Sequence, residues 1–406
     1  MNRSILKVVA AASAMTLALA ACGNDSGDGD GGGGATDGGG DATPIKIGII
    51  ADLTGATGDV GTPYNEGMLA YIDYRNADGG IDGHPIDAAS NDYAYEVPKA
   101  EQLYKQYVND GVVAIQGWGT GDTEALRTKV ANDELPFMSG SFAEPLADPE
   151  ESPYNFVVAP TYSDQMRIAL NWINEDSGGA GEVAVFHSDS PFGQAPVADG
   201  EAWIDEQGYD LGYASYPMPT GANFVGLLSQ AKSQGAEYIV IQHVASPAAQ
   251  VAKDIKDQGL DMKIVCLNWC ANELFITTAG DEAAEGHMLV QPFAPVSSEK
   301  PGHVTISAYL EEEGESIDDK GAAWVQGWAV MDVMAQGMAK VLEEEDEVTG
   351  PALKEALETM GAIDTEGLIG DGTVEFSAES HRGSTSSGVY RAEGGAMVEV
   401  EAGATP

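Results

Sequence analysis

Cysteine, histidine and basic residues are scarce in this sequence. Its 406 residues include 3 Cys, 6 His and 19 Lys and Arg against 65 Asp and Glu, which gives a formal net charge of −46 at pH 7. A surface this acidic repels nucleic acids and anionic lipids, so nucleic-acid binding is excluded. It also keeps a protein soluble where salt screens the repulsion among its own charges.

Motifs of the common enzyme classes are missing as well. No P-loop, HExxH or GxSxG motif occurs, and the histidines are dispersed along the chain. Ser229 and Lys232 match an SxxK pattern, but they lie on a predicted amphipathic helix without supporting motifs. After the strand that ends at Gln116, Asp122 stands where a dinucleotide-binding fingerprint needs its third glycine. We therefore expect no enzyme activity, catalytic residue or cofactor.

An apolar run near the N-terminus predicts export. Val8 to Leu17 follows Arg3 and Lys7 and leads to Leu19-Ala20-Ala21-Cys22. This run is too short to span a bilayer and ends in small residues and a cysteine, which is the pattern of a lipoprotein signal peptide. We expect a signal peptide over residues 1–21, a lipid on Cys22, and an extracytoplasmic protein held by that lipid at the outer face of the cell membrane or in the periplasm.

Residues 22–43 are mostly Gly and Asp. Because they offer no apolar side chain larger than Ala, burial cannot offset the entropy lost on ordering, and we expect a disordered tether.

Cys266 and Cys270 are the other two cysteines. An oxidising compartment favours a disulfide between them, with two free thiols as the alternative. No further ligand stands at metal-binding spacing, so we expect no metal site.

The remaining chain, from Pro44 to Pro406, is too long for one core and suits two domains of roughly 150 residues each. Short β-branched runs alternate with amphipathic segments, and the pattern restarts near Glu182. This alternation predicts an α/β fold of two doubly wound, Rossmann-like lobes. The predicted strands are Ile45–Ala51, Ile86–Ser90, Val112–Gln116, Leu135–Ser139, Asn155–Ala159, Glu182–His187, Leu211–Tyr216, Tyr238–Gln242 and Lys263–Leu267. The predicted helices include one that opens at Pro63 and one over Ala322–Leu342.

Large or polar side chains follow many of these strands. In open α/β sheets ligands bind beyond the carboxyl ends of the strands, so such residues are expected to converge on one cleft between the lobes. Each residue taken alone is equally well explained by packing. The candidate ligand-binding residues are Trp118, Gly119, Thr120, Ser141, Phe142, Tyr162, Phe192, His243, Asn268, Trp269 and Trp324.

Five segments in order carry a family resemblance: IKIGIIADLTGATGDVG, YIDYRNADGGIDGHPI, ADPEESPYNFVVAPTYSDQ, VFHSDSPFGQA and AAEGHMLVQPF. They resemble the branched-chain amino acid class of ABC-transporter solute-binding proteins, which have the type I periplasmic binding fold. The resemblance implies a clamp whose lobes are joined by three crossovers, with residues 44–162 and 292–372 in the N-terminal lobe and 163–291 and 373–406 in the C-terminal lobe. It also implies a monomer that delivers a small solute to a membrane permease.

The resemblance carries over to the ligand site only in part. The turn that holds the amino acid carboxylate is similar to Gly119-Thr120-Gly121, and Phe192 takes the place of a tyrosine. A threonine expected near Ser141 and Ala143 is missing. The acidic partner of the α-ammonium is expected near Asn268 to Cys270, where no carboxylate occurs.

A buried ammonium without a countercharge is costly. We therefore expect a small carboxylate or amide, aromatic solutes included, rather than an α-amino acid. Branched-chain amino acid uptake and a ligand-sensing subunit of a membrane receptor are the alternatives. An amidase on this fold and a purely structural surface lipoprotein are more remote ones.

Overall fold

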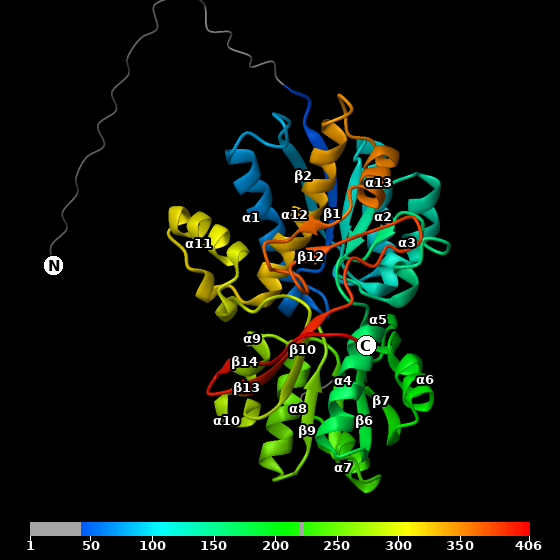
Figure 1. Ribbon diagram of the computed structural model, residues 1–406, viewed down its shortest axis with the longest axis vertical. Helices are drawn as coiled ribbons and strands as arrows, with labels where there is room; N and C mark the ends of the chain where they lie inside the picture. The colour runs from blue at the N-terminus through cyan, green and yellow to red at the C-terminus, as the bar shows by residue number, and fades with distance from the viewer. Residues whose placement is uncertain (1–41, 220–222) are drawn as a thin grey trace, which may run out of the picture. The chain divides into compact units, whose positions relative to one another are not determined.

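The computed structural model describes residues 42–219 and 223–406, which belong to one compact unit. The expected signal peptide, Cys22 and nearly all of the tether lie outside the described residues. Two mainly parallel sheets flanked by helices make up most of this unit (Figure 1). The fold is α/β with two doubly wound halves, as the alternating pattern predicted.

The first sheet has five parallel strands in the order β2-β1-β3-β4-β5. Helix α1 packs on α12, α2 on α3, and α13 on α12. We call this sheet with these five helices the N-terminal lobe. Its elements are β1 (Ile45–Ala51), α1 (Gly58–Ala77), β2 (Ile86–Asp92), α2 (Val97–Asp110), β3 (Ala114–Gly117), α3 (Thr120–Asn132), β4 (Phe137–Ser139), β5 (Asn155–Phe156), α12 (Ala322–Leu342) and α13 (Gly350–Thr359).

The second sheet repeats the same winding, because its parallel strands run in the order β7-β6-β8-β9-β10, and β13 and β14 then extend it antiparallel beside β10. We call this sheet with α4 to α10 the C-terminal lobe. Its elements are α4 (Tyr162–Asp176), β6 (Ala180–Ser188), α5 (Pro191–Gln194), α6 (Val197–Gln207), β7 (Asp210–Met218), α7 (Val225–Ser233), β8 (Tyr238–Gln242), α8 (Ala245–Asp257), β9 (Lys263–Cys266), α9 (Glu273–Ala279), α10 (Asp281–Ala284), β10 (Met288–Gln291), β13 (Ser387–Glu393) and β14 (Ala396–Ala404).

Helix α1 begins at Gly58, five residues before the start predicted at Pro63. The buried Asp52 carboxylate accepts hydrogen bonds from the backbone N–H of Gly55 at 2.7 Å and of Thr57 at 2.9 Å, and it thereby fixes the loop that leads into the helix. Pro63 removes only the N–H that would reach back to Asp59, near the helix start, where this loss is tolerated. The predicted strand and helix boundaries elsewhere agree within a few residues, but the elements that were not predicted include α4, α5, α9, α10, β10 and β14.

The crossing of α1 and α12 depends on two glycines. A Cβ atom on Gly67 would lie 2.0 Å from the carbonyl oxygen of Trp324, and one on Gly327 would lie 1.9 Å from that of Tyr64. The two backbones therefore approach as closely as they do only because both positions lack a side chain. This contact buries Trp324 against Trp328, with ring centroids 5.7 Å apart.

Within the described residues the chain passes between the lobes three times: after β5, after β10 and before β13. The first and third crossovers run side by side, since the N–H of Val157 donates to His381 O at 2.9 Å and the N–H of Gly383 donates to Val157 O at 2.7 Å. The short strands β11 (Ile363–Asp364) and β12 (Thr373–Val374) pair with each other and join neither sheet. Helix α11 (Pro301–Glu313) follows the second crossover.

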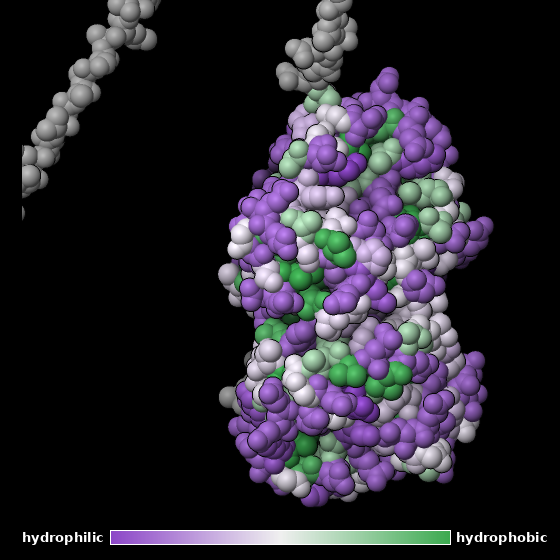
Figure 2. All heavy atoms as spheres, turned by 60° about the vertical axis from the view of Figure 1, so that its left-hand side comes forward, coloured by the Kyte–Doolittle hydropathy of each residue, from purple (hydrophilic) through white to green (hydrophobic). Residues whose placement is uncertain are grey.

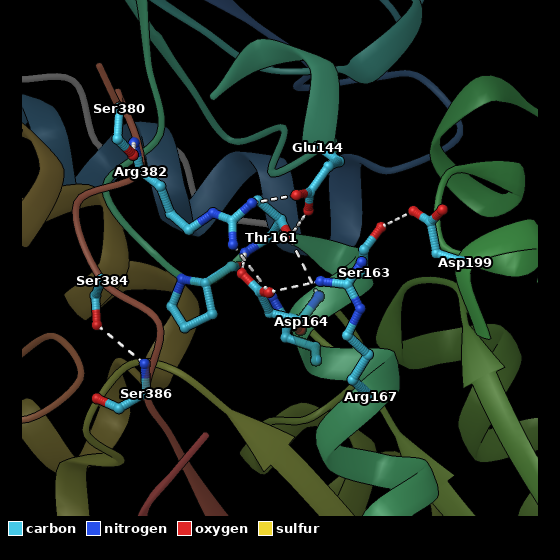
Figure 3. A network of polar contacts seen from close by, with 12 residues as sticks. Glu144, Thr161, Ser163, Asp164, Arg167, Asp199, Ser380, Arg382, Ser384 and Ser386 are labelled. Carbon is cyan, nitrogen blue, oxygen red and sulfur yellow. Dashed lines mark hydrogen bonds and ion pairs between the residues drawn. The ribbon is translucent and has the colours of Figure 1, made fainter. Parts of the chain in front are cut away.

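An ion-pair network ties these crossovers to both lobes (Figure 3). The Arg382 guanidinium donates to Glu144 and, at 3.2 Å, to Asp164 Oδ1. Asp164 Oδ2 also accepts the N–H of Thr161, whose hydroxyl donates to Glu144. Burial raises the pKa of the Asp164 carboxyl, and the Arg382 charge opposes that rise. The network fixes where α4 begins relative to the crossovers.

Two further predictions concern the cysteines and the surface. Cys266 and Cys270 are free and buried, so the expected disulfide is not formed. Residues 267–271 make a helical turn after β9, and the Cys270 thiol donates to Ile241 O at 3.3 Å.

The face drawn in Figure 2 is largely hydrophilic, with scattered apolar residues. None of the helices in the described part of the chain is long and apolar enough to cross a membrane.

Candidate functional site

A small cavity lies between the lobes at the carboxyl ends of the parallel strands. Its volume is about 10 Å³, which is room for about one water molecule. Both lobes contribute to its wall, and no charged side chain does. The lining residues are Thr57, Tyr95, Trp118, Gly119, Thr120 and Gly140 from the N-terminal lobe and Tyr162, Phe192, Val244 and Trp269 from the C-terminal lobe.

Two tryptophans from opposite lobes meet in this cavity. Trp118 follows β3, Trp269 follows β9, and their ring centroids are 4.5 Å apart at an interplanar angle of 54°. The Trp118 indole N–H donates to the Thr57 hydroxyl at 2.7 Å, and that of Trp269 donates to Gly140 O at 2.9 Å. Each indole is therefore oriented by a hydrogen bond at its edge, which leaves its faces for other rings.

Further aromatic rings surround the pair. Tyr162 and Phe192 line the cavity with centroids 5.3 Å apart, and Phe142 stacks behind Trp269 at 5.9 Å. Tyr64 from α1 contacts both tryptophans, with its ring centroid 5.0 Å from that of Trp118. The buried Tyr64 hydroxyl has no hydrogen-bond partner among the described residues.

A pair of hydroxyl groups lies at the N-terminus of α3. Thr120 Oγ1 and Ser141 Oγ are 2.7 Å apart, and both side chains are buried. No side chain of the preceding residue caps α3, so the first N–H groups of this helix are directed at the same place. Hydroxyls and a helix N-terminus together attract an anionic or carbonyl oxygen.

The structure gives three predicted site residues other positions. Asn268 lies in a buried carboxamide cluster, where its Oδ1 accepts the Gln326 amide at 3.1 Å. His243 accepts the N–H of Val244 at 2.8 Å, and Val244 rather than His243 lines the cavity. Burial, with a contribution from His187, lowers the pKa of His243 to about 4, so it is neutral at pH 7. Trp324 packs in the α1–α12 contact.

Four residues of the site were missed by the sequence interpretation: Thr57, Tyr64, Tyr95 and Val244. A usable signal existed for Thr57 and Tyr95, because they lie in the loops that follow β1 and β2, as Trp118 does in the loop after β3. Tyr64 lies on a helix, where an aromatic residue is more often part of the core. Only the packing of α1 on α12 places it at the cleft.

One buried carboxylate lies beneath the Gly119 turn. Asp122 Oδ1 accepts the Tyr93 hydroxyl at 2.7 Å, and its Oδ2 has no hydrogen-bond partner among the described residues. Burial raises the pKa of Asp122 to about 7, although the Tyr93 hydrogen bond opposes this. No group of three or more His, Cys, Asp or Glu side chains is placed to hold a metal ion in residues 42–219 and 223–406.

Comparison with known protein families shows which family this chain belongs to. A family model described as a periplasmic binding protein matches residues 44–396. This chain belongs to the periplasmic binding protein family. The family resemblance noted in the five sequence segments is thereby confirmed, and the chain is a solute-binding protein of the class that serves ABC permeases. Periplasmic binding proteins of this family are extracytoplasmic.

Relatives within the family differ in the solutes that their names give. The leucine-, isoleucine-, valine-, threonine- and alanine-binding protein of Pseudomonas aeruginosa is 22% identical over 317 residues, which cover 77% of this chain and 83% of that protein. A branched-chain amino acid transporter structure from Thermus thermophilus with bound valine matches at a TM-score of 0.85 and 23% identity, covering 90% and 97% of the two chains. A fatty acid transporter substrate-binding protein from Thermomonospora curvata matches at 0.80 and 20%, covering 90% and 93%. The shared fold therefore leaves the solute open.

Proposed function

We propose that this protein captures a small, flat organic acid or amide without an α-ammonium group and delivers it to an ABC permease. We also propose that it acts as a monomer, held by a lipid on Cys22 at the outer face of the membrane. The predicted signal peptide that ends before Cys22 supports the lipid.

The uncharged wall of the cavity carries the proposal. None of its ten lining residues is Asp, Glu, Lys or Arg. An α-ammonium buried against these rings would have no partner on the wall and would lose its hydration, which costs several kcal/mol. A neutral amide needs only hydrogen bonds, and a carboxylate, although charged, is stabilised by hydroxyl donors and by the positive end of α3.

The hydrogen-bonding groups fit one oxygen-bearing end of a solute. The Thr120 and Ser141 hydroxyls and the N-terminus of α3 suit a carboxylate or amide oxygen. The unpartnered hydroxyl of Tyr64, whose ring contacts both tryptophans, is a further polar group near the cavity. The polar groups therefore fix the orientation of the solute, while the rings hold its body.

The tryptophan pair favours a flat solute. Trp118 and Trp269 are in contact in this arrangement, so a solute that enters the cleft must separate them. A planar group can stack on both indoles once their faces are about 7 Å apart, which is less opening than a thicker aliphatic group needs. Benzoate, phenylacetate, benzamide and urea contain such a planar group.

A second candidate is an α-amino acid, and the Asp122 carboxylate favours it. Its Oδ2 is buried and unpartnered beside Tyr93, below the turn expected to bind the solute. If the Gly119 turn moves on binding, this oxygen can meet an ammonium group. In that case the charge partner comes from α3 instead of from the 268–270 segment.

A thermal-shift screen in high salt separates the two candidates. Benzoate, phenylacetate, benzamide, acetamide and urea are compared with valine and leucine, and a solute at a hundred times its Kd adds about 2.7 kcal/mol of stability. The proposal expects the largest shift from an acid or amide, and that shift should persist in Asp122→Asn. A largest shift from valine or leucine, lost in Asp122→Asn, would establish the second candidate.

Transport and sensing use the same clamp, so the site does not separate them. Permease and ATPase genes beside this one would support transport. A receptor gene in their place would support a sensing subunit.

A further inference from the structure

A carboxylate of the N-terminal lobe caps a helix of the C-terminal lobe. Asp59 lies in the first turn of α1, and its Oδ2 accepts the backbone N–H of Ser246, in the first turn of α8, at 3.0 Å. The two residues are 187 positions apart in the chain. This bond therefore exists only while the lobes are in contact.

Helix α8 cannot cap itself. Its N-cap residue is Val244, which has no side-chain acceptor, and no side chain from that position bonds the helix. The third helical residue is Pro247, which has no N–H, so the Ser246 N–H is one of the few free donors of the first turn. A carboxylate at this place satisfies the donor and also interacts favourably with the positive end of the helix.

A carboxylate of the C-terminal lobe likewise caps a helix of the N-terminal lobe. Glu273 of α9, in the C-terminal lobe, accepts the N–H of Ala322 at 2.8 Å, and Ala322 is the first residue of α12 in the N-terminal lobe. The residue before it is Gly321, which provides no side-chain cap. Asp59, Glu273 and Ala322 line one groove of about 280 Å³. Each lobe thus supplies the cap that a helix of the other lobe lacks.

We propose that Asp59 is a closure residue, which stabilises the closed clamp through the N-terminus of α8 and so slows release of the solute. Its hydrogen bond at 3.0 Å is lost once the lobes separate by about half an ångström to one ångström. Asp59 does not line the ligand cavity, so it acts on retention and not on solute choice. The inference rests on closure of a solute-binding clamp but not on which solute binds.

The rate at which two engineered cysteines cross-link the lobes tests whether Asp59 stabilises the closed clamp, and no solute is needed. A Cβ atom on Gly121 would lie 3.5 Å from Pro191 Cγ across the cleft, so Gly121→Cys with Pro191→Cys should form a disulfide only when the lobes are closed. The rate under a mild oxidant then reports the closed fraction, and peptide mapping separates this bridge from the buried native thiols. In this background we expect Asp59→Ala to lower the rate about fivefold, the effect of a typical cap.

Two variants distinguish a cap from a general charge effect. Asp59→Asn keeps an acceptor, and asparagine caps helices about as well as aspartate, so its rate should stay within twofold of the parent. Glu66→Ala removes one charge from the exposed face of the same helix and should also leave the rate unchanged. Equal rates for Asp59→Ala and Glu66→Ala would overturn the proposal, as would equal slowing by Asp59→Ala and Asp59→Asn.

The outcome stays separate from that of the solute screen. If no acid or amide binds, the proposed solute class fails, but the cross-linking rates still test Asp59. If the rates do not depend on Asp59, the closure residue is disproved whatever solute binds. In Asp59→Ala the dissociation rate of the solute with the largest thermal shift should rise about fivefold, the factor by which the cross-linking rate falls.

Discussion

The indole N–H of Trp269 donates to the carbonyl oxygen of Gly140 at 2.9 Å and lies 3.1 Å from the Tyr162 hydroxyl. Trp269 belongs to the turn after β9 in the C-terminal lobe, whereas Gly140 follows β4 in the N-terminal lobe. One side chain thus provides both an aromatic wall and a polar contact between the lobes.

Replacing Trp269 should weaken solute binding in two steps. Trp269→Phe keeps a ring but removes the donor to Gly140, and we expect about a tenfold loss of affinity. Trp269→Ala also removes the ring, and we expect binding to fall by a hundredfold or more. Calorimetry with the solute of largest thermal shift measures both. Trp203→Phe, in α6 and outside the cavity, is the control, and unchanged affinity in Trp269→Ala would remove Trp269 from the site.

Asp122 should make stability fall as the pH rises. Burial raises its pKa from 3.8 to about 7, so the folded protein holds this proton where the unfolded chain has lost it. The stabilisation is complete below about pH 4 and is lost as the pH rises through 7. Relative to Asp122→Asn, the wild type should lose about 4 kcal/mol between pH 4 and pH 8, measured by denaturant unfolding. A pH-independent difference between the two proteins would contradict this.

Arg382 should contribute more to stability than an exposed arginine does. It pairs with Asp164, whose side chain is 1% exposed, so Arg382→Gln leaves a buried carboxylate with one partner fewer. We expect a loss of about 2 kcal/mol in the free energy of unfolding. Arg391→Gln is the matched control, because Arg391 and Glu393 form an exposed pair worth at most about 0.5 kcal/mol. Equal losses in the two variants would show that the crossover network is not stabilising.

Thiol titration checks the state of the two cysteines. Burial raises the pKa of Cys266 well above its usual range, and Cys270 is also buried, so neither should react with Ellman's reagent in the folded protein. Unfolding in denaturant should release two reactive thiols from protein whose Cys22 is lipidated. No released thiol would mean that the bridge expected from the oxidising compartment forms after all.

The net charge of −46 predicts a stabilising effect of salt. Because repulsion among surface carboxylates is screened at high ionic strength, the melting temperature should rise between low salt and about 1 M salt. A potassium chloride titration followed by calorimetry measures it. A flat or falling melting temperature would show that the acidic surface does not limit stability.

Local patterns were sufficient to predict most of the fold. Strands β1 and β8 and helix α12 have the predicted boundaries, because a short β-branched run or a long amphipathic segment carries its own signal. Strand β14 was not predicted, although Val398 to Glu401 alternate between apolar and acidic residues as in an edge strand. Helix α4 was not predicted, although its buried Met166, Ala169, Leu170 and Ile173 recur at helical spacing.

By itself, the sequence determined the acidic character and the two α/β lobes, and it predicted an export signal and the strand ends at which a solute would bind. All of these depend on residues close together in the chain. The tertiary structure alone decided which strand-end residues face the cleft. In the folded protein Asn268 hydrogen-bonds to Gln326, and Trp324 packs in the contact between α1 and α12. Tyr64, by contrast, contacts Trp118 beside the cleft. The contact between Asp59 and Ser246 likewise depends on how the two lobes meet, which no local pattern encodes.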